Sequence, residues 1–427
     1  MKQQKVVLVE GCRTPFLKSG GAYMDLMSYQ LGKYAIKGLL NKTQIEPNMV
    51  DRVIMGTVVS NLKTSNVARE AALAAGLSSK TACHTVTQAC ISANRAIATA
   101  YLEIFAGQAD MIIAGGVDNT SDTPITYKKE MQKKLFGAQK LKSTTDFLKF
   151  ATTLRPTDFA PERPKVAEFL TDRVMGEDCD IMAARLEISR EDQDNFAVRS
   201  HHMAAKAWEE GHLAKEVVPV AIPPNFDLIA KDDGVRGDSS IDKIATLRPA
   251  FDKKFGTLTA ANSSFLSDGA AAVLLMSEDK AIELGLTPKA EIIDFVFTGQ
   301  DLDTELLLGP AYAVAKLFER NNMGFDDIDV VEFHEAFAGQ ILSNIKCLAS
   351  DEFAQEHLGQ DKAVGEVPME RFNLWGGSLS IGHPFGATGA RLLTTTANRL
   401  IHEKGTYGVL AACAAGAHGH AMLIRSY

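Results

Sequence analysis

Short apolar runs alternate with amphipathic segments along most of this chain. Residues 5–10 and 111–119 are apolar runs of strand length, whereas apolar positions at 24–40 recur at the three- and four-residue spacing of a helix. The same criteria predict further strands at 51–59 and 290–299, and further helices at 66–75, 190–213 and 309–321 and in the segment that ends at 399. Strands that alternate with helices are typical of layered α/β domains.

The pattern changes between residues 122 and 245, where prolines are scattered and charged residues become more frequent. Small and apolar segments of the earlier type return at 257–277 and continue towards the C-terminus. We therefore predict two α/β half-domains, one formed by residues 1–121 with 246–277 and the other by residues 278–427. Residues 122–245 are predicted to form an inserted loop domain.

The two α/β runs repeat one order of segments. DRVIMGTVV at 51–59 corresponds to DIDVVEFHE at 327–335, and MIIAGGVDN at 111–119 is loosely matched by YGVLAACAAG at 407–416. Between them, HTVTQAC at 84–90 corresponds to the Gly-rich loop that precedes the last helix. This order predicts an internal duplication, with a residue of reactive type on a strand-to-helix turn in each half.

Composition narrows the class of protein. The 427 residues are 46% hydrophobic and 23% charged, with a formal net charge of -8, which suits a soluble enzyme and argues against nucleic-acid binding. The six cysteines form no CxxC pair, so neither a disulfide framework nor a metal site is predicted, and His418 and His420 are interpreted as structural. No targeting segment precedes the first strand and no apolar run has membrane-spanning length, so we predict a cytoplasmic location.

Residues 128–150 differ from the acidic chain around them. This stretch has seven lysines, two acidic residues and interleaved leucine and phenylalanine. It could be a solvated lysine-rich face, or a surface for an anionic lipid, for acyl-CoA phosphates or for a partner protein. The sequence leaves these alternatives open.

Four segments carry candidate chemistry: Cys90, HEAF at 334–337, GHP at 382–384 and Cys413. Cys90 is predicted to lie at a helix N-terminus, where backbone N–H groups and the helix dipole favour a thiolate. A lone cysteine among alanine and isoleucine is more often a small buried apolar residue. His383 could equally be a structural residue of a Gly-rich turn.

Taken together, these segments resemble the signatures of the thiolase family. The resemblance rests on QACISANRA, TAANSSFLSDGAAA, HEAFAGQ, GGSLSIGHPFGATGAR and CAAGAHGHAM, in this order. Many thiolases have NEAF where this chain has HEAF. In this respect the chain resembles the branch of the family that contains the β subunits of fatty-acid oxidation trifunctional complexes and their bacterial equivalents. The resemblance implies a five-layered αβαβα fold, a homodimer or tetramer, and coenzyme A as a substrate with no tightly bound cofactor.

The resemblance also implies roles for the four segments in cleaving a 3-ketoacyl-CoA. Cys90 would be the nucleophile, His383 its base, and Cys413 the acid and base for the acetyl-CoA product and the incoming coenzyme A. His383 and a water held by His334 would form one oxyanion hole, and the backbone N–H groups of Cys90 and Ala415 a second. Ala415 stands where thiolases commonly have glycine, which would reshape the second hole.

Coenzyme A contacts are carried over by position to Ser264 and Phe251, with Phe337 as a wall residue. Met175 is also a predicted contact. Val174, which precedes it, stands where many thiolases have histidine, so one polar contact to the substrate would be missing. A biosynthetic enzyme that forms acetoacetyl-CoA and a non-catalytic acyl-CoA-binding protein are alternative interpretations. Docking of a hydratase/dehydrogenase α subunit or a peripheral membrane contact through 128–150 is compatible with catalysis.

Overall fold

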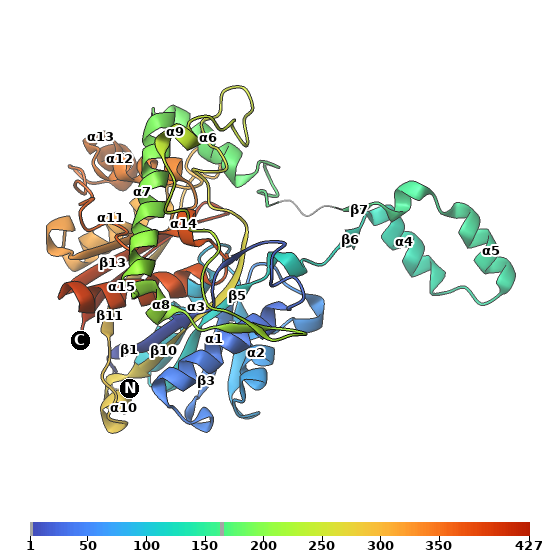
Figure 1. Cartoon of the computed structure of the whole chain (residues 1–427), viewed down its shortest axis with the longest axis horizontal. Coiled ribbons are helices and arrows are strands. Elements are labelled where there is room, and N and C mark those ends of the chain that lie inside the picture. The colour runs from blue at the N-terminus through green and yellow to red at the C-terminus, as the bar shows by residue number, and fades with distance from the viewer. Residues whose placement is uncertain (1–2, 163–165) are drawn as a thin grey trace. The chain divides into compact units, whose positions relative to one another are not determined.

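The computed structural model describes residues 3–162 and 166–427 (Figure 1). These residues separate into two compact units, one within Met1–Asp122 and Met175–Tyr427 and the other within Thr123–Val174. Residues 1–2 and 163–165, which the predicted domain ranges include, lie outside the described residues.

The larger unit is built on a single sheet, in which the described residues form ten strands. Nine strands follow the order β12-β13-β14-β11-β1-β10-β5-β3-β4, and β2 pairs with β10. Their bounds are β1 Val6–Arg13, β2 Leu17–Lys18, β3 Arg52–Gly56, β4 Ala82–Val86, β5 Met111–Asp118, β10 Ser267–Ser277, β11 Ala290–Gly299, β12 Val330–Phe333, β13 Tyr407–Ala414 and β14 His418–Ser426.

The pairing directions repeat on the two sides of this sheet. Strands β1 and β11 meet antiparallel at its centre, through the pairs Val7–Glu291 and Leu8–Ala290. Outward from that seam, β1–β10–β5 and β11–β14–β13 are antiparallel, whereas β5–β3 and β13–β12 are parallel. The topology therefore has the repeat expected from the order of segments in the sequence.

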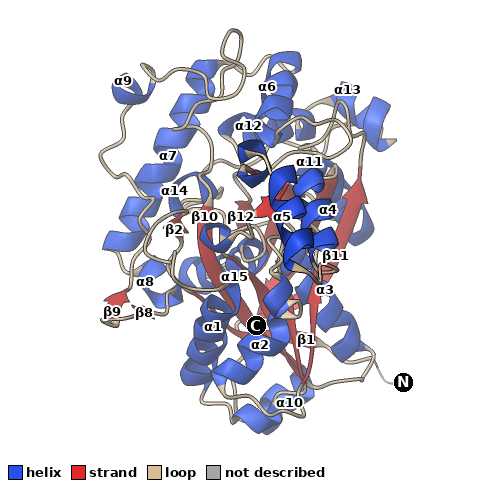
Figure 2. Cartoon of the chain, turned by 90° about the vertical axis from the view of Figure 1, so that its right-hand side faces the viewer, coloured by secondary structure: helices blue, strands red, loops and turns tan. Residues whose placement is uncertain are grey.

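Helices cover and separate the two halves of the sheet. α1 (Ser28–Thr43) and α2 (Val67–Ala75) pack on the first half, whereas α11 (Gly309–Asn321) and α12 (Ala338–Leu348) belong to the second. α3 (Ser92–Phe105) and α15 (Thr388–Glu403) lie between the halves, and Figure 2 shows strands in the middle with helices on both sides. The described elements thus form the five predicted layers.

Alternating burial explains the layers. In β5, Ile112 and Ala114 join the core that contains α3 and α15, whereas Met111 and Ile113 join the core beneath α1 and α2. Because successive side chains of a strand point to opposite faces, an apolar strand buries both faces and needs a helical layer on each.

Residues 175–245 belong to the larger unit, which differs from the predicted insertion of 122–245. α6 (Met175–Arg185) contacts α12, and α7 (Arg190–Glu209) contacts α14 (Ser378–Ile381). Phe196 and Ala204 of α7 are buried in this packing. The predicted helix 190–213 ends early at Gly211, with φ of 76°, and α8 (His212–Glu216) follows.

Shorter elements complete the larger unit. They are β8 Val220–Ile222, β9 Asp227–Ile229, α9 Ile241–Ile244, α10 Glu278–Glu283, α13 Asp351–Phe353, the π-turn Ala354–Leu358, and the 3-10 turns Pro47–Met49, Leu62–Thr64, Thr120–Asp122 and Phe325–Asp327. Among the described helices, none has the length and apolarity needed to cross a bilayer.

The smaller unit, which we call the hairpin unit (residues 123–174), consists mainly of two helices. α4 (Lys129–Ala138) and α5 (Thr144–Thr153) are joined by a short turn, and the two-residue strands β6 (Thr126–Tyr127) and β7 (Pro161–Glu162) pair beside the 3-10 turn Pro156–Phe159. Ser143 caps α5 through the backbone N–H of Asp146. Lys134 of α4 is 2.6 Å from a carboxylate oxygen of Asp158.

Candidate active site

Cys90 lies on a sharp turn between β4 and α3, as its position in the sequence predicts. Ala89 has a φ of 44°, a left-handed conformation that costs a residue with a Cβ on the order of 1 kcal/mol. The turn is held because the N–H of Ser92 donates to the carbonyl of Ala89 at 3.0 Å, and the N–H of Gln88 donates to the Ser92 hydroxyl at 2.8 Å. Cys90 is half-buried and lies two residues before Ser92, the first residue of α3.

His383 is held with one ring nitrogen free of protein partners. Its Nδ1 lies 2.6 Å from the hydroxyl oxygen of Thr388, and that hydroxyl donates its hydrogen to the carbonyl of Pro384 at 3.0 Å. Thr388 must therefore accept from His383 Nδ1–H, which leaves a lone pair on Nε2. Nε2 is buried and has no hydrogen-bond partner among the described residues. This is the tautomer that a general base requires.

His334 lies directly beside His383. The ring centroids are 4.0 Å apart, and the planes are inclined by 40°. Nδ1 of His334 is 2.9 Å from the Ser378 hydroxyl oxygen, whereas its Nε2 is buried without a partner in the described part of the chain. The structure thus places two buried imidazoles in contact, each with an unused Nε2.

Burial keeps both imidazoles neutral. It lowers the pKa of His383 to about 3, with a further contribution from the positive charge of Arg391. Burial also lowers the pKa of His334 well below its ordinary value, and the positive charge of Arg391, or of a protonated His383, acts in the same direction. At neutral pH, the pair can therefore offer a base or a hydrogen-bond donor without carrying charge.

Cys413 lies in β13, one residue before the end of the strand. The backbone N–H of His334 donates to the backbone carbonyl of Ala411 at 2.8 Å, two residues before Cys413. Burial raises the pKa of the Cys413 thiol well above its usual value, and the nearby Cys90 raises it further. Cys413 therefore holds its proton at neutral pH, as a proton donor must.

The turn after Cys413 shows the backbone conformation of Ala415, which stands where thiolases commonly have glycine. In this turn, positive φ angles occur at Gly416 (79°) and Ala417 (53°), and not at Ala415. Alanine at 415 therefore needs no left-handed backbone.

Close packing of α3 and α15 brings the two reactive turns together. A Cβ added to Gly389, in the first turn of α15, would lie 2.1 Å from the side-chain oxygen of Asn94 in the first turn of α3. Only glycine permits this approach. Since Cys90 precedes α3 and His383 precedes α15, the tight contact fixes the two turns in one place.

The predicted coenzyme A contacts lie around the HEAF segment. The Ser264 N–H donates to the carbonyl of Ala336 at 2.9 Å, and the rings of Phe251 and Phe337 meet edge to face at 5.9 Å between centroids. A Cβ on Gly176, next to Met175, would lie 2.3 Å from the ring of Phe251. These four predicted residues therefore cluster beside the helix α12 that follows HEAF.

Sequence reasoning missed the residues that hold the two histidines. Thr388 follows His383 by five residues, and Ser378 precedes it by five, both within GGSLSIGHPFGATGAR. Ser267 accepts a hydrogen bond from the His383 N–H at 2.9 Å. The signal that could have found them is the concentration of serine and threonine in these loops.

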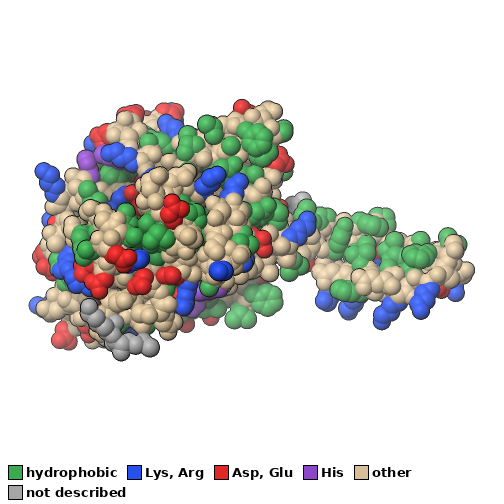
Figure 3. Space-filling model, turned by 90° about the horizontal axis from the view of Figure 1, so that it is seen from below, with side chains coloured by type: hydrophobic (Ala, Val, Ile, Leu, Met, Phe, Trp, Pro, Cys, Tyr) green, Lys and Arg blue, Asp and Glu red, His purple; other side chains and the backbone are tan. Residues whose placement is uncertain are grey.

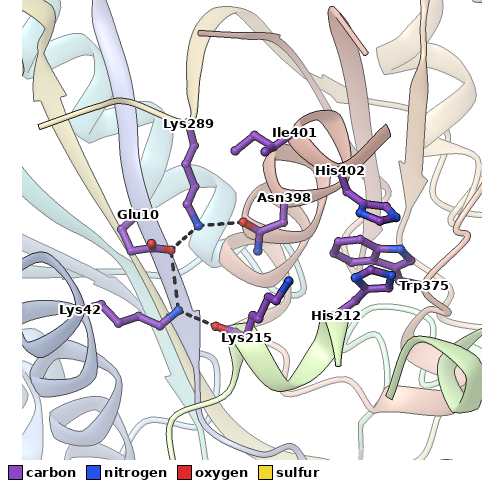
Figure 4. A pocket seen from close by; sticks show the side chains of 9 residues that line it. All are labelled: Glu10, Lys42, His212, Lys215, Lys289, Trp375, Asn398, Ile401 and His402. Atoms are coloured by element: carbon purple, nitrogen blue, oxygen red, sulfur yellow. Dashed lines mark hydrogen bonds and ion pairs between the residues drawn. The ribbon is translucent and has the colours of Figure 1, made fainter. Parts of the chain in front are cut away.

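A separate cavity of about 520 Å³ lies elsewhere in the larger unit (Figure 4). Glu10 contacts both Lys289 at 2.6 Å and Lys42 at 3.8 Å, and Trp375 stacks on His212 with 4.5 Å between ring centroids. Its other lining residues are Lys215, Asn398, Ile401 and His402. None of the predicted site residues lines it, so we do not assign it to catalysis.

The histidines near the C-terminus make structural contacts. His420 is buried, with Nδ1 3.1 Å from the side-chain nitrogen of Asn94, and Nδ1 of His418 is 3.4 Å from the carbonyl of Thr298. Within residues 3–162 and 166–427, His, Cys, Asp and Glu form no group of three suited to a metal ion.

Comparison with known proteins adds independent information. Residues 6–279 match the family profile "Thiolase, N-terminal domain" and residues 286–426 match "Thiolase, C-terminal domain". The mitochondrial trifunctional enzyme subunit beta of Bos taurus is 51% identical over 424 residues, which are 99% of this chain and 89% of that protein.

Two further similarities cover nearly the whole chain. The 3-ketoacyl-CoA thiolase of Yersinia enterocolitica is 43% identical over 420 residues, which are 98% of this chain and 96% of that protein. The crystal structure of the Bacillus anthracis acetyl-CoA acetyltransferase has a TM-score of 0.85 at 30% identity, with all of both chains covered.

Proposed function

Since this chain belongs to the thiolase family, we propose that it is an acyltransferase that cleaves 3-ketoacyl-CoA with coenzyme A in fatty-acid β-oxidation. The observation that carries this proposal is the pair of buried imidazoles, His334 and His383, each with an unused Nε2. Cys90 lies close enough to Cys413 to raise the pKa of that thiol. This arrangement offers a base and an anion-stabilising donor at one place.

The first half-reaction uses Cys90, His383 and Cys413. His383 Nε2 takes the Cys90 proton, and the thiolate attacks the 3-keto carbon of the substrate. The bond between C2 and C3 then breaks, and its electron pair goes to the acetyl-CoA enolate. Cys413 gives its proton to C2 of that enolate, so acetyl-CoA leaves and the shortened acyl group stays on Cys90.

The second half-reaction returns the enzyme to its starting state. The Cys413 thiolate takes the proton of incoming coenzyme A, whose sulfur attacks the acyl-Cys90 thioester. The bond from the acyl carbon to Cys90 sulfur breaks, the shortened acyl-CoA leaves, and Cys90 recovers its proton from His383. The backbone N–H groups of Cys90 and Ala415 are proposed to stabilise the oxyanion of this step.

The direction and chain length can be tested by comparing two substrates. Two relatives carry names that refer to 3-ketoacyl-CoA thiolase and the trifunctional enzyme, which favours degradation of longer chains over acetoacetyl-CoA formation. We expect kcat/KM for a 3-ketohexadecanoyl-CoA to exceed that for acetoacetyl-CoA by about tenfold, since each buried methylene adds binding free energy. Thiolysis is followed by loss of the 3-ketoacyl-CoA absorbance.

The outcomes separate the alternatives. Activity confined to the four-carbon substrate would indicate the biosynthetic enzyme. Binding of acyl-CoA without turnover of either substrate, and without an acylated Cys90 in the mass spectrum, would indicate a non-catalytic binding protein.

We also propose that the hairpin unit contacts an anionic membrane surface. Phe136, Phe147 and Leu148 are 54–69% exposed, and residues 128–150 carry seven lysines against two acidic residues. Figure 3 shows hydrophobic side chains along one side of this unit and lysine and arginine along the other. Exposed apolar side chains with nearby lysines are typical of helices that lie at a lipid interface.

Cosedimentation with vesicles tests this proposal. The full chain is expected to bind vesicles with anionic lipid and to dissociate at high salt, because the lysine contribution is screened. Phe136→Ser with Leu148→Ser should weaken binding at least about fivefold through lost apolar burial, while thiolysis of a soluble substrate stays unchanged. Phe226→Ser, at an exposed apolar position of the larger unit, is the matched control.

The same variants test whether the hairpin unit binds a partner protein instead of a membrane. If vesicles do not bind but the double variant abolishes co-purification with a hydratase/dehydrogenase subunit, the hairpin unit is a protein-docking surface and the membrane proposal is wrong. A homodimer or tetramer, and a cytoplasmic location, stay predictions that light scattering and cell fractionation can test.

A further inference from the structure

The hydroxyl of Ser378 connects His334 to a buried cluster of charges. Its oxygen is 2.9 Å from His334 Nδ1 and accepts a hydrogen bond from Arg391 Nη2 at 3.1 Å. All three side chains are fully buried. Arg391 Nη1 is in turn 3.8 Å from Glu332, whose other oxygen accepts from Arg399 at 2.8 Å.

The direction of the hydrogen bond between Ser378 and His334 follows from counting hydrogens. A guanidinium only donates, so Arg391 uses one lone pair of the Ser378 oxygen. The serine hydroxyl has a single hydrogen, and His334 Nδ1 is the acceptor that the described residues provide for it. If Nδ1 carried the imidazole hydrogen instead, the Ser378 hydrogen would be a buried donor without an acceptor, which folded proteins avoid.

Charge favours the same arrangement. The Nδ1 lone pair of His334 is directed to the serine that Arg391 contacts, so the more negative edge of the ring faces the positive guanidinium. Glu335 is bound by Asn373 and Ser200. The ionisable groups around this ring and its cluster are His383, Arg391, Glu332, Glu335, Arg399, Arg13 and Glu216.

We propose that Ser378, held by Arg391, is a positioning residue that keeps the imidazole hydrogen of His334 on Nε2. His334 is then a hydrogen-bond donor, whereas its neighbour His383, whose Nδ1–H is bound to Thr388, is an acceptor at Nε2. Two adjacent imidazoles thus hold opposite tautomers, and one serves as base while the other donates towards the substrate oxygen. This inference rests on the proposed function.

A kinetic test uses Ser378→Ala and its neighbour Ser380→Ala. Loss of a hydrogen-bond donor from an oxyanion hole lowers kcat by about a hundred- to a thousandfold. In Ser378→Ala the donor stays but its tautomer is no longer fixed, so kcat should fall by roughly ten- to a hundredfold. KM for coenzyme A should stay within about twofold of the wild type. Ser380 lies on the same helix α14 and is equally buried, but its hydroxyl contacts Ser200 and the carbonyl of Gly377. Ser380→Ala should keep kcat within about threefold.

A double-mutant cycle separates positioning from simple packing. In a His334→Asn background the side-chain amide donates without any tautomer to fix, so Ser378→Ala should have no further effect beyond about twofold. An undiminished effect of Ser378→Ala in that background would overturn the proposal, because Ser378 would then act on something other than His334. Ser378→Thr, which keeps the hydroxyl, should recover kcat.

A spectroscopic measurement reads the His334 tautomer directly in the wild-type chain, without the Ser378→Ala variant. In the wild-type chain with ¹⁵N-labelled histidine, the His334 ring signals are identified by their loss in His334→Asn. We expect Nε2 to be the protonated nitrogen, and a protonated Nδ1 would overturn the proposal. Absence of thiolysis in the wild type would contradict the proposed function, whereas wild-type activity with an unaffected Ser378→Ala would contradict only this inference.

Discussion

Cys90→Ala is expected to abolish acyl transfer, with a loss of at least about 10⁴-fold in kcat, because no other nucleophile can form the thioester intermediate. Coenzyme A should still bind with an affinity within about twofold of the wild type, since the change removes only the sulfur from a half-buried turn. Stopped-flow thiolysis measures the first effect, and isothermal titration measures the second.

Cys83→Ala is the matched control for Cys90→Ala. Cys83 lies seven residues earlier on β4, is also half-buried, and its thiol contacts the carbonyl of Thr81 at 3.4 Å, away from the paired imidazoles. It should keep full activity and an acyl adduct on Cys90 in the mass spectrum. Normal turnover by Cys90→Ala would contradict the proposed mechanism.

His383→Asn is expected to lower kcat by about 10³-fold, because the change removes the base that takes the Cys90 proton. The acyl-transfer rate of the wild type should not fall between pH 7 and pH 5 through His383, since the folded-state pKa of about 3 keeps this imidazole neutral there. Rapid-quench measurement of acyl-Cys90 formation across this range tests both statements.

The same lowered pKa makes His383 a source of acid sensitivity. In the unfolded chain, histidine binds a proton near pH 6.5, whereas folded His383 binds one only near pH 3. The neutral His383 side chain therefore makes its full contribution to the free energy of unfolding above pH 6.5. This contribution is lost progressively as the pH falls towards 3. From pH 7 to pH 5 the loss is about 2 kcal/mol.

His383→Asn lacks this titration. Between pH 7 and pH 5 the wild type should therefore lose about 2 kcal/mol more unfolding free energy than the variant. Urea denaturation at the two pH values measures this difference. A constant difference across this range would show that His383 titrates normally in the folded state.

Apolar periodicity was sufficient to predict most of the sheet and its helices. The predicted helix at 309–321 coincides with α11, and the strand predicted at 290–299 coincides with β11. The insertion of residues 122–245 stays a prediction, but proline and charge did not reveal that residues 175–245 pack within the larger unit. α7 has many polar residues, yet it buries one face against α14.

The candidate site shows a different limit of sequence reasoning. The resemblance to thiolases identified Cys90, His334, His383 and Cys413, and the structure places these residues on neighbouring turns and strand ends. The hydroxyls of Thr388 and Ser378 could not be assigned to particular histidines, because the pairing depends on the direction of side chains across two loops. Hydrogen positions follow only from the full set of donors and acceptors.

The seam between β1 and β11 affects how firmly the two halves of the sheet are held in register. Two residue pairs join the strands there, whereas Gly389 of α15 and Asn94 of α3 meet with no room for one further methyl group. The proposed nucleophile, Cys90, precedes α3 in one half, and its proposed base, His383, precedes α15 in the other. We therefore expect a small displacement of one half against the other to lower kcat before it lowers the free energy of unfolding.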